Sequence, residues 1–300
     1  MNNLTKLVLT ATLLAVSSMS VAQSEPDESA DELKIAALEA LMAAPAEKAM
    51  PLVNKVLAGN NSDDVKERAL FILSQIDTPE AQATLLRFAR EEQGSLQAEA
   101  IRMIGIGGDE TTLAELGAIY AAGDREARDA VLEAYLIAGD KKAVFEIAAN
   151  ADNSDDFEEA VDILGAMGAS DELRELRSRT GVSETLIDAY AVSGDFESLR
   201  ELARDGSDVE MQAEAIEALG MIGGDQVNQE LVEIYRGAAS DDIREAALDG
   251  MLIADYDSGV LELYRSSDSS AEKKELLEYL VMMDSDEVWD IVDSALDGGL

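Results

Sequence analysis

The chain of 300 residues contains no cysteine and no histidine. It can therefore form no disulfide, and it lacks the commonest general base and the commonest metal ligand. These absences exclude His-containing catalytic triads, Cys/His zinc sites and histidine-ligated iron. The Asp-rich segments 152–156, 255–259 and 284–287 lack the twelve-residue spacing of a calcium loop. We therefore expect no catalytic residue, no cofactor and no metal site.

Aromatic residues and prolines are also scarce. Aromatics make up 4% of the chain and there are four prolines, whereas hydrophobic residues in total reach 47%. The apolar content lies mainly in alanine and leucine, which favour helices, while strands prefer aromatic and β-branched residues. The composition predicts an all-helical protein with enough apolar side chains to bury a core.

Basic residues are the third scarcity. The chain has 23 Lys and Arg against 63 Asp and Glu, a formal net charge of −40. Nucleic-acid binding depends on Lys and Arg that neutralise phosphates, and anionic membranes attract basic segments, so both are poor partners. A basic protein is compatible with this surface. A salty medium is compatible too, because high net charge keeps a protein soluble.

The first 22 residues, MNNLTKLVLTATLLAVSSMSVA, have the layout of a secretory signal peptide. A lysine supplies positive charge, a mostly apolar stretch follows, and the small residues Ser20 and Ala22 suit signal peptidase. We expect cleavage between Ala22 and Gln23 and a periplasmic protein. An uncleaved anchor is the alternative, but the apolar run is shorter than a span of about 20 residues. The polar, acidic residues 23–30 are expected to form a disordered leader.

One stretch of the chain occurs twice. Residues 98–120, AEAIRMIGIGGDETTLAELGAIY, match residues 213–235, AEAIEALGMIGGDQVNQELVEIY, at 10 of 23 positions. They belong to a longer series of helix, turn and helix, whose period of roughly 30 residues is typical of a solenoid. Each turn is marked by a glycine or an aspartate where a helix ends: Asp77, Gly108, Gly139, Gly168, Gly194, Gly223, Asp255 and Asp284.

Apolar residues in the helices before these turns recur at i, i+4, i+5 and i+8, which places them on one face. No stretch alternates as a strand does. We predict an all-α fold, a right-handed α-solenoid of about nine HEAT-like helix pairs. It should span residues 31–297, with residues 298–300 as a tail.

The repeat unit resembles the HEAT repeat. The resemblance lies in the helix starts DDVKERAL (63–70) and DDIREAAL (241–248) and in the core pattern A-I-x-x-L-G-x-I-G-x-D. It is closest to the short bacterial type described in phycobilin lyases. Tetratricopeptide repeats are the rival, but their unit is longer and carries a Trp/Leu-Gly/Tyr pattern that is missing here.

The resemblance implies a binding scaffold whose concave face is lined by the helices that end at the marked turns. Two catalytic relatives are known in the family. The di-iron hydroxylase needs His-Glu ligand pairs, which this chain lacks, and phycobilin lyases act in the cytoplasm, whereas the signal peptide indicates export. We therefore expect a protein that is not an enzyme.

One position in the helices of the predicted concave face stands out as a candidate binding site. It points away from the buried face, and stacked repeats would place its copies roughly 10 Å apart. General surface acidity is the competing interpretation, because 63 of 86 charged residues (63 acidic plus 23 basic) are acidic anyway. We call this set the central row: Phe71, Arg102, Glu133, Asp162, Asp188, Glu217, Asp249 and Glu278.

The sequence thus predicts a monomeric scaffold of the cell envelope that binds another protein, one with a basic patch or segment, along its concave acidic face. The alternative is a structural envelope protein, acidic because its host lives in salt, with no ligand in the acidic groove. The sequence selects neither a partner nor a pathway.

Overall fold

A computed structural model describes residues 28–284 and 287–296, and every regular element in these ranges is helical. The predicted signal peptide and most of the predicted leader, together with residues 297–300, lie outside the described residues. The first helix begins at Glu28, so the last three residues of the predicted leader are helical.

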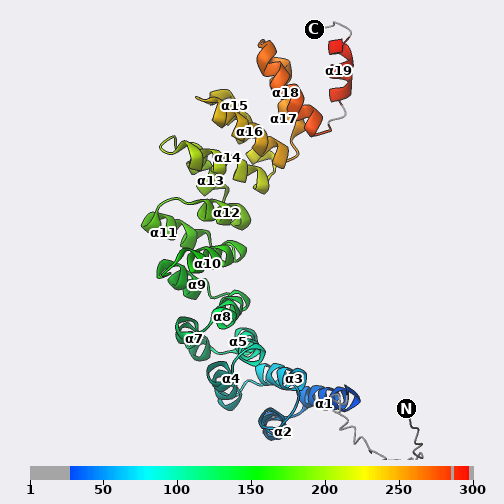
Figure 1. The fold of residues 1–300 in the computed structure, drawn as a ribbon, viewed down its shortest axis with the longest axis vertical. Coiled ribbons are helices and arrows are strands. Elements are labelled where there is room, and N and C mark those ends of the chain that lie inside the picture. The colour runs from blue at the N-terminus through cyan, green and yellow to red at the C-terminus, as the bar shows by residue number, and fades with distance from the viewer. Residues whose placement is uncertain (1–27, 285–286, 297–300) are drawn as a thin grey trace, which may run out of the picture.

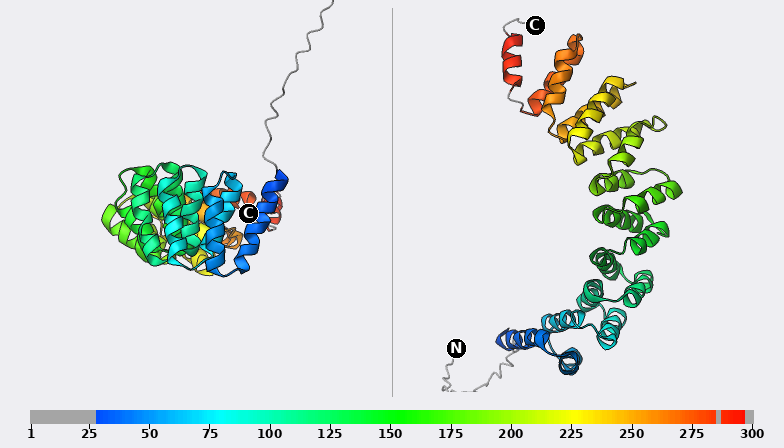
Figure 2. Two further views of the ribbon diagram at one scale, coloured as in Figure 1. Left: turned by 90° about the horizontal axis from the view of Figure 1, so that it is seen from below. Right: turned by 180° about the vertical axis from the view of Figure 1, so that it is seen from behind.

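The helices form an arc of two rows (Figure 1). The inner row lies on the concave side, and the view from behind in Figure 2 shows the same curvature. In the described chain the inner row has nine helices: α1 (Glu28–Ala40), α3 (Asp63–Ser74), α5 (Ser95–Gly107), α8 (Arg125–Ala138), α10 (Ser154–Ala166), α12 (Glu184–Ser193), α14 (Val209–Ile222), α16 (Asp241–Ile253) and α18 (Ser270–Met282).

Each inner helix is followed in the chain by a partner, which completes a pair. A short 3-10 helix, η1 (Leu41–Ala43), lies between the first two helices, and the third partner is split into two short helices. The nine predicted pairs and the all-α solenoid are confirmed for the described residues. The partners are α2 (Ala46–Ala58), α4 (Pro79–Glu91), α6 (Glu110–Ala114) with α7 (Leu116–Ala122), α9 (Lys141–Ala149), α11 (Ser170–Thr180), α13 (Phe196–Ala203), α15 (Asp225–Gly237), α17 (Asp257–Ser266) and α19 (Val288–Leu296).

The marked turn residues end the inner helices in two ways. Gly139 and Gly194 adopt left-handed backbone angles, with φ of 73° and 70°, as expected of a residue that follows a helix. Gly108 is an exception to the prediction, since its φ is −70°. Glycine is needed at position 108 because an added Cβ would clash with the carbonyl oxygen of Ile104. At the preceding Gly107 an added Cβ would clash with the carbonyl of Ser74 on the neighbouring inner helix.

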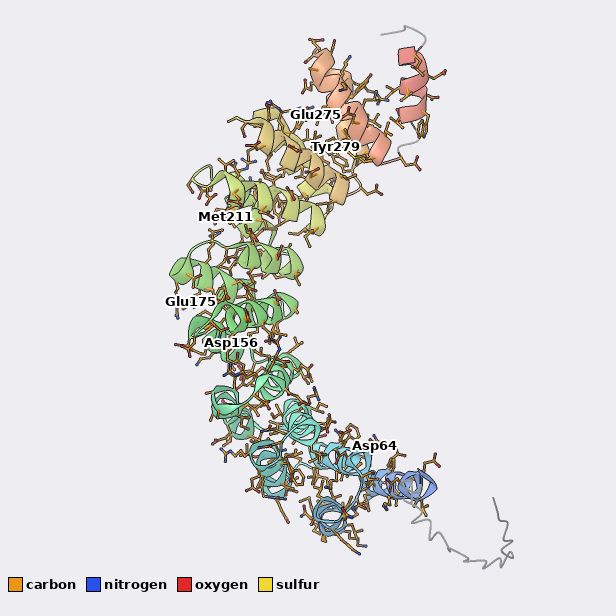
Figure 3. The ribbon with its side chains drawn as sticks, viewed as in Figure 1. Asp64, Asp156, Glu175, Met211, Glu275 and Tyr279 are labelled. Carbon is orange, nitrogen blue, oxygen red and sulfur yellow. The ribbon has the colours of Figure 1, made fainter. Side chains whose placement is uncertain are left out.

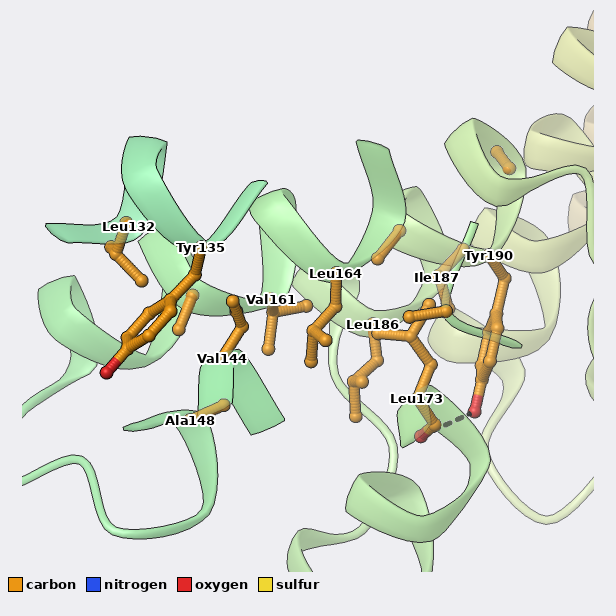
Figure 4. Close-up of a cluster of buried hydrophobic side chains, with 14 of the residues drawn as sticks. Leu132, Tyr135, Val144, Ala148, Val161, Leu164, Leu173, Leu186, Ile187 and Tyr190 are labelled. Carbon is orange, nitrogen blue, oxygen red and sulfur yellow. Dashed lines mark hydrogen bonds between the residues drawn. The ribbon is translucent and has the colours of Figure 1, made fainter. Parts of the chain in front are cut away.

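The core lies between the two rows and runs without a break along the array. Figure 4 shows its central part, where Leu164 and Ile187 of inner helices meet Leu173 of an outer helix. Tyr190 is fully buried, and its hydroxyl donates a hydrogen bond of 3.1 Å to the carbonyl of Leu173. That bond satisfies a polar atom that would otherwise be buried without a partner.

Neighbouring inner helices come into close contact through small residues. A Cβ added to Gly105 would lie 2.6 Å from the Cα of Ala134, and one added to Gly165 would lie 3.1 Å from the Cα of Ala189. At Gly220 the added atom would collide with the backbone of Gly250. Each contact joins one inner helix to the next, so these glycines set how closely the backbones of the inner row approach.

Leucine at the equivalent position has the opposite effect. Leu136 of α8 and Leu252 of α16 stand where the glycines stand in α5, α10 and α14. The backbones of α8 and α10, and those of α16 and α18, approach each other much less closely than the glycine-bearing neighbours do. The closest approaches in the inner row thus occur where this position holds glycine, and the two widest of these junctions are those where it holds leucine.

We predict that Gly220→Ala destabilises the protein by about 1–3 kcal/mol, the usual cost of overpacking a close contact, even though alanine favours helix. Gly237→Ala is the matched control. Gly237 is also a helical residue, the last of α15, and nothing lies within 4 Å of a Cβ added there. Urea unfolding followed by circular dichroism measures both. A Gly220→Ala protein as stable as the control would contradict the role of this contact.

The concave face as a candidate binding site

The exposed face of the inner row looks into the concave side of the arc. Inner helices pack against outer helices behind them and against their neighbours in the row, which leaves one face of each uncovered. The central row lies on this face, and Glu133, Asp162 and Asp188 are exposed there. The structure thus brings the predicted residues together along one surface, although the individual members differ in their surroundings.

The first members of the central row are neutralised within the protein. Phe71 is half-buried against the core, and the guanidinium of Arg68 lies 4.8 Å from the centre of its ring. The Nε of Arg102 lies 2.5 Å from a carboxylate oxygen of Glu133, and its Nη1 lies 3.7 Å from Glu99. This end of the row is therefore not a run of free negative charge.

The middle members are different. Asp162, Asp188 and Glu217 form no ion pair with a basic side chain anywhere in the described part of the chain. Partial burial raises the pKa of Asp162, and the charge of Asp188 raises it further. Burial also raises the pKa of Glu217, with further increases from Asp249 and Glu214 among its acidic neighbours. The charged forms of Asp162 and Glu217 are thus penalised both by burial and by repulsion from neighbouring carboxylates.

At the carboxyl-terminal end of the central row, the carboxylates have partners within the protein. The hydroxyl of Tyr279 donates to a carboxylate oxygen of Asp249 at 2.7 Å, linking α18 to α16. Burial and this carboxylate raise the pKa of Tyr279 well above its ordinary value. Glu278 has Lys274 at 3.6 Å, one turn away on the same helix. Figure 3 shows Tyr279 and Glu275 on α18, with the side chains of the whole array.

Basic residues are kept away from the middle of the concave face. The inner helices α10, α12 and α14 contain no lysine or arginine. The five basic residues between α10 and α14 all lie on the outer helices or directly after one of them: Arg174, Arg177, Arg179, Arg200 and Arg204.

Most of these outer arginines pair with carboxylates on or directly before the next outer helix, while Arg179 pairs with Glu175 of its own helix. Arg177 of α11 lies 2.6 Å from Glu201 of α13, and Arg204 lies 3.1 Å from Glu233 of α15. The same pattern continues where Arg236 lies 2.6 Å from Glu262. The arginines of the outer row are therefore paired with outer-row carboxylates, whereas the middle helices of the inner row carry no basic side chain.

Two buried carboxylates of the outer row were not found by sequence reasoning. Asp195 accepts hydrogen bonds from the backbone and hydroxyl of Ser198 and an ion pair of 2.8 Å from Arg174. The carboxylate of Glu230 forms ion pairs with the Nε atoms of Arg200 and Arg204. The glycine before Asp195 signals a helix cap, but burial depends on a neighbouring helix that local sequence does not reveal.

Within 28–284 and 287–296 no three acidic side chains are grouped so that they could hold a metal ion. Over the same ranges no helix has both the length and the apolar composition needed to cross a bilayer.

Comparisons with known proteins concern the repeat. Residues 50–136 match a family model described as HEAT repeats, and these residues run from within α2 to α8. A structure of the complex of CpcE and CpcF of phycocyanin lyase from Nostoc sp. PCC7120 is similar at 17% identity, with a TM-score of 0.33, over 91% of this chain and 100% of that chain. No curated protein sequence matches the chain. The segment 50–136 thus carries HEAT repeats, and the helix pairs that follow it have the same arrangement.

We predict that neutralising Asp162 and Glu217 stabilises the protein at neutral pH. A raised pKa in the folded state means that the charged carboxylate weakens folding, and this penalty disappears as pH falls through the folded pKa. The double variant Asp162→Asn, Glu217→Gln should melt roughly 1–3 °C higher at pH 7, on the scale of surface effects. The difference should shrink toward pH 4.

The matched control is Glu80→Gln with Asp225→Asn, which removes two acids from the first turns of outer helices. There negative charge is favourable because of the helix dipole, so the control should melt at the same temperature or slightly lower. Thermal melts at several pH values measure both variants. A destabilised concave variant would contradict the account of this face.

Proposed function

We propose that the protein is a non-enzymatic scaffold of the cell envelope that binds another protein along its concave acidic face. One observation carries this proposal. The middle of the concave face holds Asp162, Asp188 and Glu217 without balancing cations, on helices that lack basic residues. The nearby arginines are committed to the opposite row. A cationic surface docked on this face would relieve the repulsion that the protein leaves in place.

The residue types of the chain and the arrangement of its carboxylates favour a binding role over catalysis. It has no histidine or cysteine, and the concave carboxylates form a row across several helices and not a closed pocket with converging groups. Solenoids expose long curved surfaces, which suit the recognition of macromolecules. The acidity of this surface favours a protein partner with a basic patch or segment and disfavours nucleic acid. We expect the scaffold to act as a monomer.

The place of action is inferred from the sequence. Residues 1–22 have the layout of a signal peptide, with cleavage between Ala22 and Gln23, so the protein would work in the periplasm. The absence of cysteine is compatible with an oxidising compartment. Fractionation of cells that express the full chain, with amino-terminal sequencing of the product, tests both the location and the cleavage site.

The second candidate is a structural, salt-adapted envelope protein without a dedicated ligand. The observation that favours it is the acidity of the whole chain, 63 acidic against 23 basic residues. Salt adaptation would place surplus acids on both faces alike. The concentration of arginines on the outer helices around α10 to α14 supports the binding scaffold instead.

We predict that a photo-crosslinking amino acid at Asp188 or Glu217 captures a discrete protein partner in the host cell. The same amino acid at Glu80 or Glu110, which lie on outer helices, should capture none. Western blots after irradiation show the adducts. The adduct should also weaken when Asp162 is changed to Lys, because a positive charge in the row repels a basic partner.

Equal adducts from inner and outer positions would place the site elsewhere. No adduct from any position, with the protein folded and correctly located, would favour the salt-adapted structural protein.

A further inference from the structure

A second row of side chains runs beside the central row, and it is apolar. It occupies the position four residues later in each inner helix, just before the helix ends. These side chains are exposed by 46% to 60%, although they are large and hydrophobic. We call this set the apolar row: Ile106, Ile137, Val192, Met221, Ile253 and Met282.

The apolar row is not a chance scatter of exposed hydrophobic residues. Single exposed apolar side chains are common on proteins and need no explanation. Here, however, six of the fifteen large hydrophobic side chains that are exposed in the described residues share one repeat position. In α10 the position holds Ala166, which is small, and in the first repeat of the row it falls on Gln75, directly after α3. The row is therefore continuous from α12 to α18.

The two rows are parallel and adjacent. Residues i and i+4 of a helix lie on the same face, about 6 Å apart along the axis. Asp188 therefore stands beside Val192, Glu217 beside Met221, and so on through α16. The uncovered face of the inner row thus presents a line of negative charge next to a line of apolar side chains.

We propose that this face binds an extended polypeptide segment of the partner, with an apolar residue about every third position and Lys or Arg between them. The inference rests on the proposed function, because it names the chemistry of the partner at the same site. The apolar residues would pack on the apolar row, and the basic residues would face the carboxylates of the central row. The best-formed part of the site lies on α12, α14 and α16.

The spacing of the helices favours an extended segment. Packed helices lie about 8–10 Å apart, and a chain in the extended polyproline II conformation advances about 3.1 Å per residue with three residues per turn. Three residues therefore span one helix between α12 and α16, and because every third side chain points the same way, each meets the next apolar residue of the face. The row also curves strongly (Figures 1 and 2). An extended chain can follow such a curve across several repeats, whereas an α-helix is straight.

The test uses three fluorescein-labelled peptides of equal length and fluorescence anisotropy with the purified protein. The first is five repeats of Leu-Lys-Ser. The second replaces each Leu by Ser and keeps the charge. The third has the composition of the first, with Leu at heptad spacing so that it suits a helix. We expect the first peptide to bind about tenfold more tightly than either of the others, since burial of several leucines adds to the charge attraction.

Two matched variants locate the effect. The row variant Val192→Ser, Met221→Ser, Ile253→Ser should lose the preference for the Leu-Lys-Ser peptide and still bind the leucine-free peptide as the unaltered protein does. The control Met42→Ser, Leu52→Ser, Val182→Ser removes three hydrophobic side chains that are also exposed but lie off the row, and it should keep the preference. Circular dichroism verifies that both fold.

The outcomes separate this inference from the proposed function. Equal binding of the first two peptides, or a preference that survives in the row variant, would overturn the apolar part of the site. Tighter binding of the heptad peptide would overturn the extended conformation and indicate a helical partner. The proposed function itself would fail if Asp162→Asn, Asp188→Asn, Glu217→Gln weakened the leucine-free peptide no more than Glu80→Gln, Glu110→Gln, Asp225→Asn does.

Discussion

The close approach of neighbouring inner helices is the constraint on which the rest of the structure depends. Gly105, Gly165 and Gly220 leave no room for a side chain where the next inner helix passes. This contact recurs at one repeat position in α5, α10 and α14, and it fixes how each of them packs against the next inner helix. Because the helices joined in this way keep their register, residues that share a repeat position line up across the concave face. Both the central row and the apolar row are consequences of that alignment.

The second organising feature is the division of charge between the two rows of helices. Around the middle of the array the outer helices carry the arginines and pair them with carboxylates such as Glu201 and Glu233. In the middle of the inner row, Asp162, Asp188 and Glu217 have no such partners among the described residues. Exposed ion pairs contribute little to stability. The pKa values of Asp162 and Glu217 are raised, first by burial and then by neighbouring carboxylates, so the charged forms of these two side chains oppose folding. A face that weakens folding in this way is better explained by binding than by stability.

Much of the fold could be predicted from the sequence, because its signals are local. The period, the apolar face of each helix and residues such as Gly139 and Gly194 all act within one repeat. Gly105 is different, because it lies inside a helix and its role is contact with Ala134. That role was hidden because it depends on the next inner helix, which lies one full repeat further along the chain.

The candidate site was predictable only in part, for the same reason. The repeat position of the central row could be found from helical periodicity. The charge balance along the row could not be found in this way, because the pairing of Arg102 with Glu133 and of Tyr279 with Asp249 joins different repeats. The apolar row was present in the sequence at a fixed spacing. Its exposure, however, depends on where neighbouring helices end, and only the structure reveals that.

The central claim is that the unbalanced carboxylates of the concave face are where a cationic chain binds. Carbodiimide coupling tests it directly, because it joins a lysine to a carboxylate in contact with it. With a lysine-containing peptide bound, mass spectrometry should find the cross-links at Asp162, Asp188 and Glu217. Cross-links spread equally over outer-helix acids such as Glu80, Glu110 and Asp225 would contradict the claim.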